Sequence, residues 1–429
     1  MSFLSFVSVL LILCVGAFTL YTNRDIFSPS KLFLGFITLF HMELLILNKP
    51  LEYYLSFFIL VLLSLFFSIY ESGLKQPQKF SNQYIEHKKT SVILIVTIWI
   101  FSLVPILAQL LLILESGGII QYLNDVIYRA ELWRGKGVIL TLIQTMQVLN
   151  VIYFAVGLYW KYEKKLWWAL YIFHFISSFS IGILTGSRSV MLMSIIIMLI
   201  VFHYLKRRIK LRNALVLMIS LLVMASIVGL ARNNFKIEDG VVTTGITASP
   251  QKVAQLSSSF RYGIIPLDFV YAYEPLKLQY GAGLITPVTN LVPRNIWPKK
   301  PDTSSMAMNK EYVEDRGPGP YEYPSGIIGL GIMNFGWVIG IPFAFLLLSF
   351  FYILSEYSYR KHIILRNSNE GFHGVLKLII AVYFIQLLPA LVIGEFSNTL
   401  HAVFLTKITP VLFFLILYRL LPIKYRKLR

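Results

Sequence analysis

The sequence predicts an all-α polytopic membrane protein. Of the 429 residues, 56% are hydrophobic and only 14% are charged, and many apolar runs approach the roughly 20 residues that a helix needs to cross a bilayer. One polar interval, 231–324, separates these runs into an N-terminal group within 1–230 and a C-terminal group within 325–429. The interval is rich in aromatic residues, so we expect a folded extracytoplasmic loop that handles a substrate rather than a disordered linker.

About eleven spans are expected from the apolar runs. They are 2–20, 31–47, 51–70, 91–114, 138–160, 166–184, 189–205, 213–230, 325–355, 375–393 and 400–421. The first run precedes its first cation, Arg24, whereas a cleaved signal peptide carries its basic residues first. We therefore expect a retained first helix with an external N-terminus. The single cysteine, Cys14, lies in it, so no intramolecular disulfide can form.

The net charge of +18 is concentrated in alternate connections between the predicted spans. These connections hold 23 of the 39 cations but only six of the 21 acidic residues, including Asp25, Glu71 and Glu356. The positive-inside rule places them in the cytoplasm, so topology rather than nucleic-acid binding explains the charge. The C-terminus is then cytoplasmic, and 115–137, 185–188, 231–324 and 394–398 are external. The 23 cations are Arg24, Lys31, Lys75, Lys79, Lys88, Lys89, Lys161, Lys164, Lys165, Lys206, Arg207, Arg208, Lys210, Arg212, Arg360, Lys361, Arg366, Lys377, Arg419, Lys424, Arg426, Lys427 and Arg429.

Several reaction classes lack their sequence patterns. The chain has no P-loop, no HExxH, no GxSxG, no paired Cys or His ligands and no DxD. We therefore expect neither a metal nor a cofactor. A transfer whose leaving group is already a lipid pyrophosphate requires neither.

Separated arginines are the main candidates for binding such a pyrophosphate. Guanidinium groups bind phosphate oxygens bidentately and stay charged, so a convergent set suits a diphosphate at the membrane surface. The loop is not a general cation patch, because 232–323 contains ten cations and nine acids. The candidate catalytic residues are Arg188, Arg232, Arg261, Arg294 and Glu395, and the candidate substrate-binding residues are Trp297, Lys299, Arg316, Tyr321, Glu322 and His401. Glu322, Glu395 and His401 are alternative general bases, each with a structural explanation as well.

Other polar or aromatic positions allow two interpretations. Trp133, in the expected interfacial helix of 115–137, suits membrane anchoring or, less readily, sugar stacking. Glu43, Lys49 and Glu52 suit solvated helix ends or, less readily, a functional cluster. Lys407, deep in the last span, is a functional candidate to be tested with Glu395. Segment 250–262 has the spacing of a surface helix, and the Gly336–Gly340 GxxxG pair suits close helix packing.

The order of these parts resembles the Wzy-type polymerases of O-antigen and capsular polysaccharide repeat units. The resemblance is carried by Gly186-Ser187-Arg188, by Gly281-x-Gly283, by the run Pro293-Arg294-Asn295-Ile296-Trp297-Pro298-Lys299-Lys300-Pro301, and by Asn334-Phe335-Gly336. It covers 185–340 closely and the remainder by topology. Relatives often carry a Glu shortly before Asn-Phe-Gly, where this chain has Gly329, Leu330 and Gly331.

The resemblance implies a metal-independent glycosyltransferase of GT-C-like architecture on the outer face of a bacterial cell membrane. It would join undecaprenyl-pyrophosphate-linked repeat units and release undecaprenyl pyrophosphate. A Wzz-like chain-length co-polymerase and a flippase are the implied partners, beside the membrane lipid. The nearest alternative is an O-antigen ligase, expected to carry a catalytic His in its large loop, but 232–323 contains none. A flippase, of a different class, would line several helices with charge, whereas Lys407 stands nearly alone at depth.

Overall fold

The structure is a computed structural model of the chain. It describes residues 3–22, 25–74, 84–86, 88–126, 133, 136–162, 164–185, 188–238, 241–244, 261–272, 277–292, 296–312, 323–366, 370–421 and 425–427. Within these ranges the side chains of 84–89, 125, 188–191, 225–244, 269, 272, 311–312 and 425–427 are not described. The expected surface helix 250–262 lies outside the described residues except for Arg261 and Tyr262.

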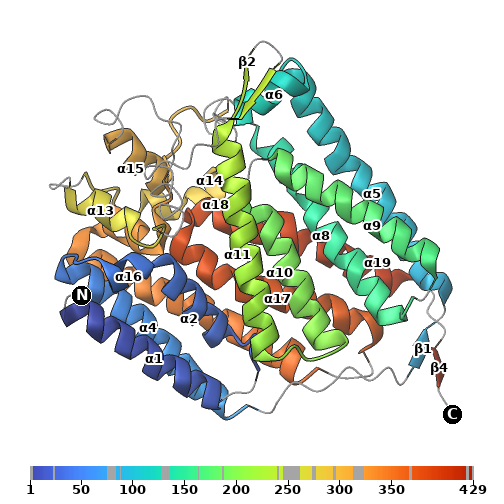
Figure 1. Cartoon of the computed structure of the whole chain (residues 1–429), viewed down its shortest axis with the longest axis horizontal. Coiled ribbons are helices and arrows are strands. Elements are labelled where there is room, and N and C mark those ends of the chain that lie inside the picture. The colour runs from blue at the N-terminus through green and yellow to red at the C-terminus, as the bar shows by residue number, and fades with distance from the viewer. Residues whose placement is uncertain are drawn as a thin grey trace. The chain divides into compact units, whose positions relative to one another are not determined.

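The chain divides into two compact units, each built from several segments (Figure 1). Unit 1 comprises Met1–Gln76, Pro250–Arg360 and Phe384–His401, so it combines the first membrane helices with much of the polar loop and with the long helix that follows the loop. Its elements are α1 (Phe3–Thr22), α2 (Pro29–Phe40), α3 (Met42–Ile46), α4 (Leu51–Ser72), α13 (Ile265–Ala272), η2 (Ala282–Leu284), α14 (Thr286–Thr289), α15 (Ser304–Tyr312), α16 (Gly326–Tyr359), the end of α17 (Gly371–Ile393) and α18 (Phe396–His401).

Unit 2 comprises Pro77–Ser249, Lys361–Tyr383 and Ala402–Arg429. Its helices are α5 (Lys88–Glu115), α6 (Ile119–Asp125), α8 (Gly137–Trp160), α9 (Lys165–Leu184), α10 (Arg188–Leu205), α11 (Leu211–Asn234), most of η4 (Arg360–Ile364), the start of α17, η6 (Ala402–Ile408) and α19 (Thr409–Leu420). Two short antiparallel ribbons pair β1 (Tyr84–Glu86) with β4 (Tyr425–Lys427) and β2 (Phe235–Glu238) with β3 (Val241–Thr244).

The predicted class, a helical polytopic membrane protein, is confirmed. Among the described residues, eight helices are long and apolar enough to cross a membrane. Shorter apolar helices, Pro29–Phe40, Leu192–Leu205 and Leu211–Met224, lie at the other three expected spans. One expected span, 31–47, is interrupted at His41, whose backbone (φ −112°, ψ 17°) leaves the helical region. The His41 ring packs on Gly263, where a Cβ would lie 2.3 Å from the ring.

Helix α16 is two helices joined at a sharp break. Gly336 has φ 73° and ψ −179°, a conformation that favours glycine. A Cβ on Gly331 would lie 2.1 Å from the carbonyl oxygen of Gly340, although nine residues of straight helix span about 13.5 Å. The chain therefore folds back at Gly336. The expected close helix contact is confirmed for Gly340, which packs against Gly331, whereas Gly336 makes the bend.

The last expected helix, 400–421, also changes character along its length. It begins as α18, passes through the π-helical turn η6 and continues as α19. The Thr409 hydroxyl donates to Phe404 O, five residues back, at 2.9 Å. Short π-helical insertions are frequent at functional sites, and this one contains Lys407.

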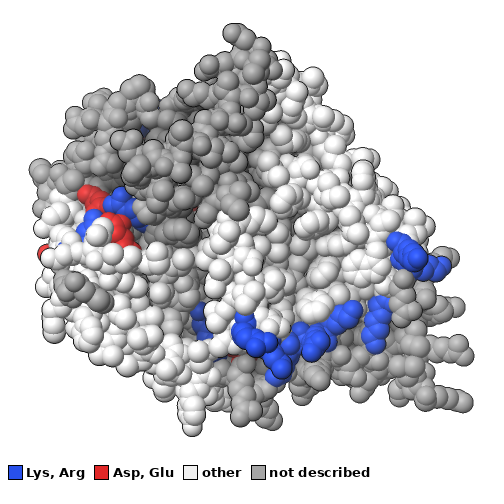
Figure 2. Space-filling view, in the orientation of Figure 1, with Lys and Arg blue, Asp and Glu red and all other residues white. Residues whose placement is uncertain are grey.

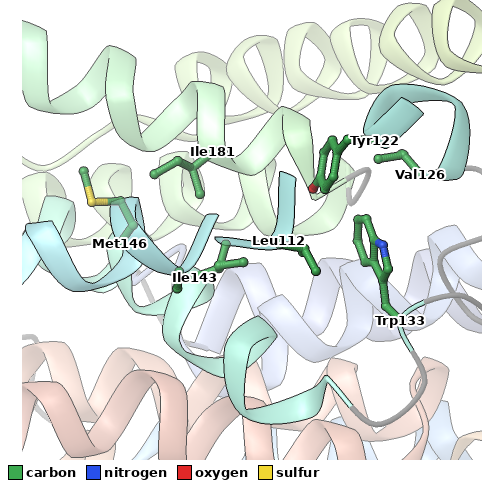
Figure 3. Close-up of a cluster of buried hydrophobic side chains, with 8 residues drawn as sticks. Leu112, Tyr122, Val126, Trp133, Ile143, Met146 and Ile181 are labelled. Carbon is green, nitrogen blue, oxygen red and sulfur yellow. The ribbon is translucent and has the colours of Figure 1, made fainter. Parts of the chain in front are cut away.

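A buried cluster in unit 2 joins Tyr122, Val126 and Trp133 to three membrane helices (Figure 3). Trp133 is 4% exposed and stacks on Tyr122, with ring centroids 5.3 Å apart. The Tyr122 hydroxyl donates to Leu184 O at 2.8 Å and so holds the end of α9. Both predicted roles of Trp133, membrane anchor and sugar platform, are therefore wrong, because its indole ring belongs to the core.

The connections of unit 2 carry the expected exposed cations. Lys161, Lys164 and Lys165 lie between α8 and α9, and Lys206–Arg212 lie between α10 and α11. Figure 2 shows described Lys and Arg side chains as a blue band along the lower edge of the view. The acidic residues that were assigned to such connections in unit 1 are buried instead. Asp25, Glu71 and Glu356 are 3%, 0% and 2% exposed, so they do not face solvent as their place in the sequence suggested.

Candidate functional site

Two sequence motifs about 50 residues apart meet at one side chain in unit 1. The amide groups of Gly281 and Gly283 both donate to Asn334 Oδ1, at 3.0 and 3.1 Å. The preceding amides, of Gln279 and Tyr280, donate to the carbonyl oxygens of Met333 and Asn334, at 2.9 and 3.1 Å. These four bonds satisfy groups at the end of the first half of α16. We call residues 279–283 with Met333 and Asn334 the Asn334 cap.

Glycine is required at the centre of the Asn334 cap for steric reasons. A Cβ on Gly283 would lie 2.4 Å from Ser304 Oγ and 2.7 Å from Asn334 Nδ2. Ser304 in turn donates to Gln279 Oε1 at 2.8 Å, and Asn334 Nδ2 donates to Leu330 O at 2.7 Å. Gly281 adopts φ 89° and turns the chain toward η2. The Gly-x-Gly motif thus permits close approach of backbone and amide side chain.

The same loop segment is fixed to α18. Asn290 Nδ2 donates to Ser397 Oγ at 2.9 Å, and His401 Nε2 hydrogen-bonds to the carbonyl oxygen of Pro287. A carbonyl oxygen can only accept, so Nε2 carries the hydrogen, and Nδ1 is the basic nitrogen of the neutral ring. His401 therefore lies beside the loop with its basic nitrogen not used by that bond.

Glu395 caps the start of α18. Its carboxylate oxygens accept hydrogen bonds from the amides of Ser397, at 3.1 Å, and Asn398, at 2.6 Å. Such bonds satisfy free amides at a helix N-terminus. Glu395 is 7% exposed, so a capping role accounts for its position without any chemistry.

Exposed apolar and aromatic side chains follow the Asn334 cap along the loop. Tyr280 is 82% exposed, Val288 71%, Ile296 74% and Trp297 41%. Lys299 is also exposed, whereas the Lys300 ammonium turns back to donate to Val292 O at 2.8 Å. An apolar surface of this kind with an adjacent cation suits contact with lipid or an isoprenoid chain. Trp297 and Lys299 were predicted here, but Tyr280, Val288 and Ile296 were not.

Arg261 belongs to a closed ion cluster with Glu43, Lys49 and Asp268. Its guanidinium pairs with Glu43 through Nε and with Asp268 through Nη2, the latter at 2.8 Å. Lys49 Nζ pairs with the same two carboxylates, at 3.1 Å each, and the Tyr53 hydroxyl donates to Asp268 at 3.1 Å. Figure 2 shows a patch of mixed charge where Figure 1 places α13.

The charges of this Arg261 ion cluster balance, two against two. A diphosphate would have to displace a carboxylate to bind Arg261, so its guanidinium is engaged with Glu43 and Asp268 in this structure, and its part in catalysis stays a prediction. Glu43 and Lys49 are 11% and 19% exposed, so the expectation of fully solvated helix ends is wrong for them. Partial burial alone would lower the pKa of Lys49, but its hydrogen bonds to Asp268 and Glu43 and their charges outweigh burial and raise that pKa.

The remaining predicted residues divide into two groups. Arg188 opens α10 and Arg232 lies near the end of α11, both in unit 2, and their side chains are not described. Arg294, Arg316, Tyr321 and Glu322 lie outside the described residues. Convergence of the arginines therefore stays a prediction.

Lys407 is half-buried in unit 2. Its ammonium lies 5.8 Å from the centroid of the Tyr383 ring, which is 1% exposed. This is a cation–π contact, a common way to stabilise a cation away from water. The predicted pairing of Lys407 with Glu395 stays a prediction.

A buried row in unit 2 has the residue types of a hydrolase triad. His174 Nε2 lies 2.9 Å from Ser102 Oγ, and its Nδ1 lies 3.1 Å from Asn150 Oδ1. All three side chains are 0% exposed, and the Ser102 hydroxyl also donates to Ile98 O at 2.8 Å. No substrate reaches such a row, so we assign it to helix packing.

The sequence reasoning missed the residues that hold the site together. Gln279, Asn290, Ser304 and Ser397 are uncharged, and single polar residues in loops have no distinctive signal. Comparison of the chain with protein-family models, with characterised proteins and with solved structures finds no match.

Proposed function

We propose that the chain polymerises undecaprenyl-pyrophosphate-linked oligosaccharide repeat units on the outer face of a bacterial cell (inner) membrane. The product would be an O-antigen or capsular polysaccharide. The proposal includes eleven spans of GT-C-like architecture, an external N-terminus and a cytoplasmic C-terminus. Its main support is the Asn334 cap, because Gly-x-Gly and Asn-Phe-Gly, two of the elements that carry the resemblance, form one structure there.

The proposed reaction needs no metal or nucleotide. A hydroxyl of the acceptor repeat unit attacks the anomeric carbon of the donor glycan, and the bond to the pyrophosphate oxygen breaks. The hydroxyl proton passes to a base, and undecaprenyl pyrophosphate leaves with the bonding electrons. Lys299 and Arg294, with Arg188 and Arg232, would stabilise the negative charge that develops on the leaving group, an effect worth several kcal/mol in such sites.

His401 is the base that the contacts favour over Glu395. Its Nε2–H is committed to Pro287 O, which fixes the ring and makes Nδ1 the proton acceptor. Both carboxylate oxygens of Glu395 already accept backbone amides. The exposed apolar residues beside the Asn334 cap would contact the isoprenoid chain, and Trp297 would stack on a sugar.

The test is polymerisation by the purified protein in proteoliposomes, with lipid-linked repeat unit isolated from the host. We expect a ladder of glycans that grows with time. One block joined to a separate lipid acceptor, without a ladder, would indicate a ligase instead. Movement of the lipid-linked unit across the bilayer without glycan transfer would indicate a flippase.

Two variants of one residue separate chemistry from structure. His401→Asn keeps a side-chain N–H for Pro287 O but has no basic nitrogen, so we expect roughly 10²–10⁴-fold slower ladder growth with unchanged expression. Normal growth in His401→Asn would remove His401 from the mechanism. Glu395→Ser keeps an oxygen that caps α18, so we expect an active enzyme.

The anion site is tested by removing single cations. Arg294→Ala and Lys299→Ala should reduce or abolish the ladder, whereas Lys210→Ala, which removes an exposed lysine of unit 2, should not. Arg188→Ala and Arg232→Ala should reduce or abolish the ladder as well. Unchanged ladders in all four variants of the predicted site would disprove the anion-site assignment.

A further inference from the structure

Two glutamates meet inside unit 1, at the end of α4. Glu71 of α4 and Glu356 of α16 are 0% and 2% exposed, and their carboxyl groups are in hydrogen-bond contact. Glu71 already accepts from Ser30, at 2.8 Å from the amide and 2.7 Å from the hydroxyl. Two carboxylates cannot donate to each other, so this contact requires a proton on one of them.

The hydrogen-bond donors around the two glutamates identify which carboxyl group carries the proton. Apart from Glu71, neither oxygen of Glu356 has a hydrogen-bond partner among the described residues. Glu71 is supplied by Ser30, so Glu71 is the acceptor and Glu356 the donor.

A third buried group faces the same point. The Tyr352 hydroxyl, on the same face of α16 as Glu356, is 0% exposed and has no partner among the described residues. Its charge interactions are with Glu71 and Glu356, and its ring stacks on Phe67 of α4 with centroids 3.8 Å apart. Buried polar atoms are nearly always hydrogen-bonded, so an unpartnered hydroxyl beside two carboxyl groups distinguishes this point from ordinary helix packing.

The neighbouring charges do not neutralise a second carboxylate. Lys31 of α2 lies near Glu71 and donates to Asp25 O at 2.8 Å. Asp25 accepts from the Tyr359 hydroxyl at 2.6 Å. Arg360 interacts with Glu356 but stacks over the Tyr70 ring at 4.9 Å. The two cations offset Asp25 and Glu71, so an ionised Glu356 would leave an uncompensated buried charge, which is very costly.

We propose that Glu71 and Glu356 form a proton-binding site that joins α4 to α16 within unit 1. The bound proton lies on Glu356 and is donated to Glu71, with Tyr352 beside it. Loss of the proton would place two negative charges in contact between apolar helices and weaken their packing. This inference is independent of the proposed polymerase function.

The proton is observed by infrared spectroscopy of the purified protein. We expect the C=O band of a protonated carboxyl group in the wild type at neutral pH and loss of one such group per chain in Glu356→Gln. Glu71→Gln should keep a protonated-carboxyl band at a shifted frequency, since Glu356 retains its proton and donates to an amide oxygen in place of a carboxylate. Glu52→Gln, an exposed glutamate at the other end of α4, should keep the wild-type band.

Thermal unfolding gives a second, independent readout. Above the ordinary pKa range of glutamate, the folded protein binds this proton and the unfolded chain does not, so stability falls as the pH rises. We expect the wild-type Tm to fall by about 2–4 °C. The Tm of Glu356→Gln should change little with pH. A protonated-carboxyl band that is absent in the wild type, or that survives unchanged in Glu356→Gln, would overturn the proposal. Stabilisation by Na⁺ over choline at equal ionic strength, lost in Glu356→Gln, would overturn it in favour of a sodium site.

Discussion

The Arg261 ion cluster and the Asn334 cap both fasten the polar loop to the membrane helices of unit 1, but they do so with opposite chemistry. The ion cluster uses four charged side chains that are 11–35% exposed. The Asn334 cap uses uncharged amides packed so closely that Gly283 has no room for a methyl group. Screened charges tolerate change, whereas close-packed backbone does not. We therefore expect the attachment at 279–283 to tolerate less change than the attachment at Arg261 and Asp268.

The largest effect is expected from Asn334→Ala. It leaves the amides of Gly281 and Gly283 without their acceptor, which should cost about 2–4 kcal/mol of stability. Asn334→Asp keeps the acceptor oxygen and should cost less. Thermal unfolding of the detergent-solubilised protein measures both, and equal losses would contradict the assigned role of Oδ1.

Gly283→Ala should be the next most damaging change. The new methyl group would meet Ser304 and Asn334 inside ordinary contact distance, so we expect a loss of about 1–3 kcal/mol. Gly35→Ala is the matched control, because a Cβ there meets no atom within 4 Å, and Ala stabilises a helix interior by about 0.5–1 kcal/mol. If both variants unfold at the wild-type temperature, the Asn334 cap is looser than described.

Asp268→Asn should cost only about 1 kcal/mol, since the pairs that it breaks are partly exposed. Salt sharpens the comparison. In about 1 M NaCl, where charges are screened beyond roughly 3 Å, the deficit of Asp268→Asn should shrink and that of Gly283→Ala should not. A salt-independent deficit in Asp268→Asn would mean that the cluster is effectively buried.

The smallest effect concerns pH. The folded-state pKa of Lys49 is raised, so its ion pairs contribute fully below the ordinary lysine value and are lost only as the pH rises through the folded value. The stability difference between wild type and Lys49→Met should therefore stay constant from about pH 6 to about pH 9. A difference that falls within this range would show that another group controls the cluster.

The sequence predicted the features that depend on composition along one segment. Long apolar runs predicted a helical membrane protein, and the uneven distribution of charge predicted that the cations in the connections of unit 2 are exposed. The break at Gly336 lies within a span that was predicted as one continuous helix. Glycine occurs both inside membrane helices and at bends, so the residue type alone does not show which of the two it forms. Trp133 was misassigned for the same reason, since its partner Tyr122 is defined only by the fold.

The candidate site was predictable where it depends on motifs and unpredictable where it depends on partners. Gly281, Gly283 and Asn334 were singled out, but nothing in the sequence placed them in contact. The ion pair of Arg261 with Glu43 could not be predicted, because Glu43 lies 218 residues away in the chain. Glu71 and Glu356 were counted as loop charges because proximity to a basic connection predicts solvent exposure.

The π-helical turn at 402–408 constrains how this region can change in length. A π turn holds about one residue more than the α turn that it replaces, at nearly the same total rotation, so deletion of one residue there would restore α-helical bonding and leave the orientation of α19 about its axis nearly unchanged. Val411, Phe414 and Tyr418 would then keep the face that they bury, whereas deletion of one residue within α19 itself would rotate the residues after it by about 100°. The loss of one residue should therefore disturb helix packing less within 402–408 than within α19.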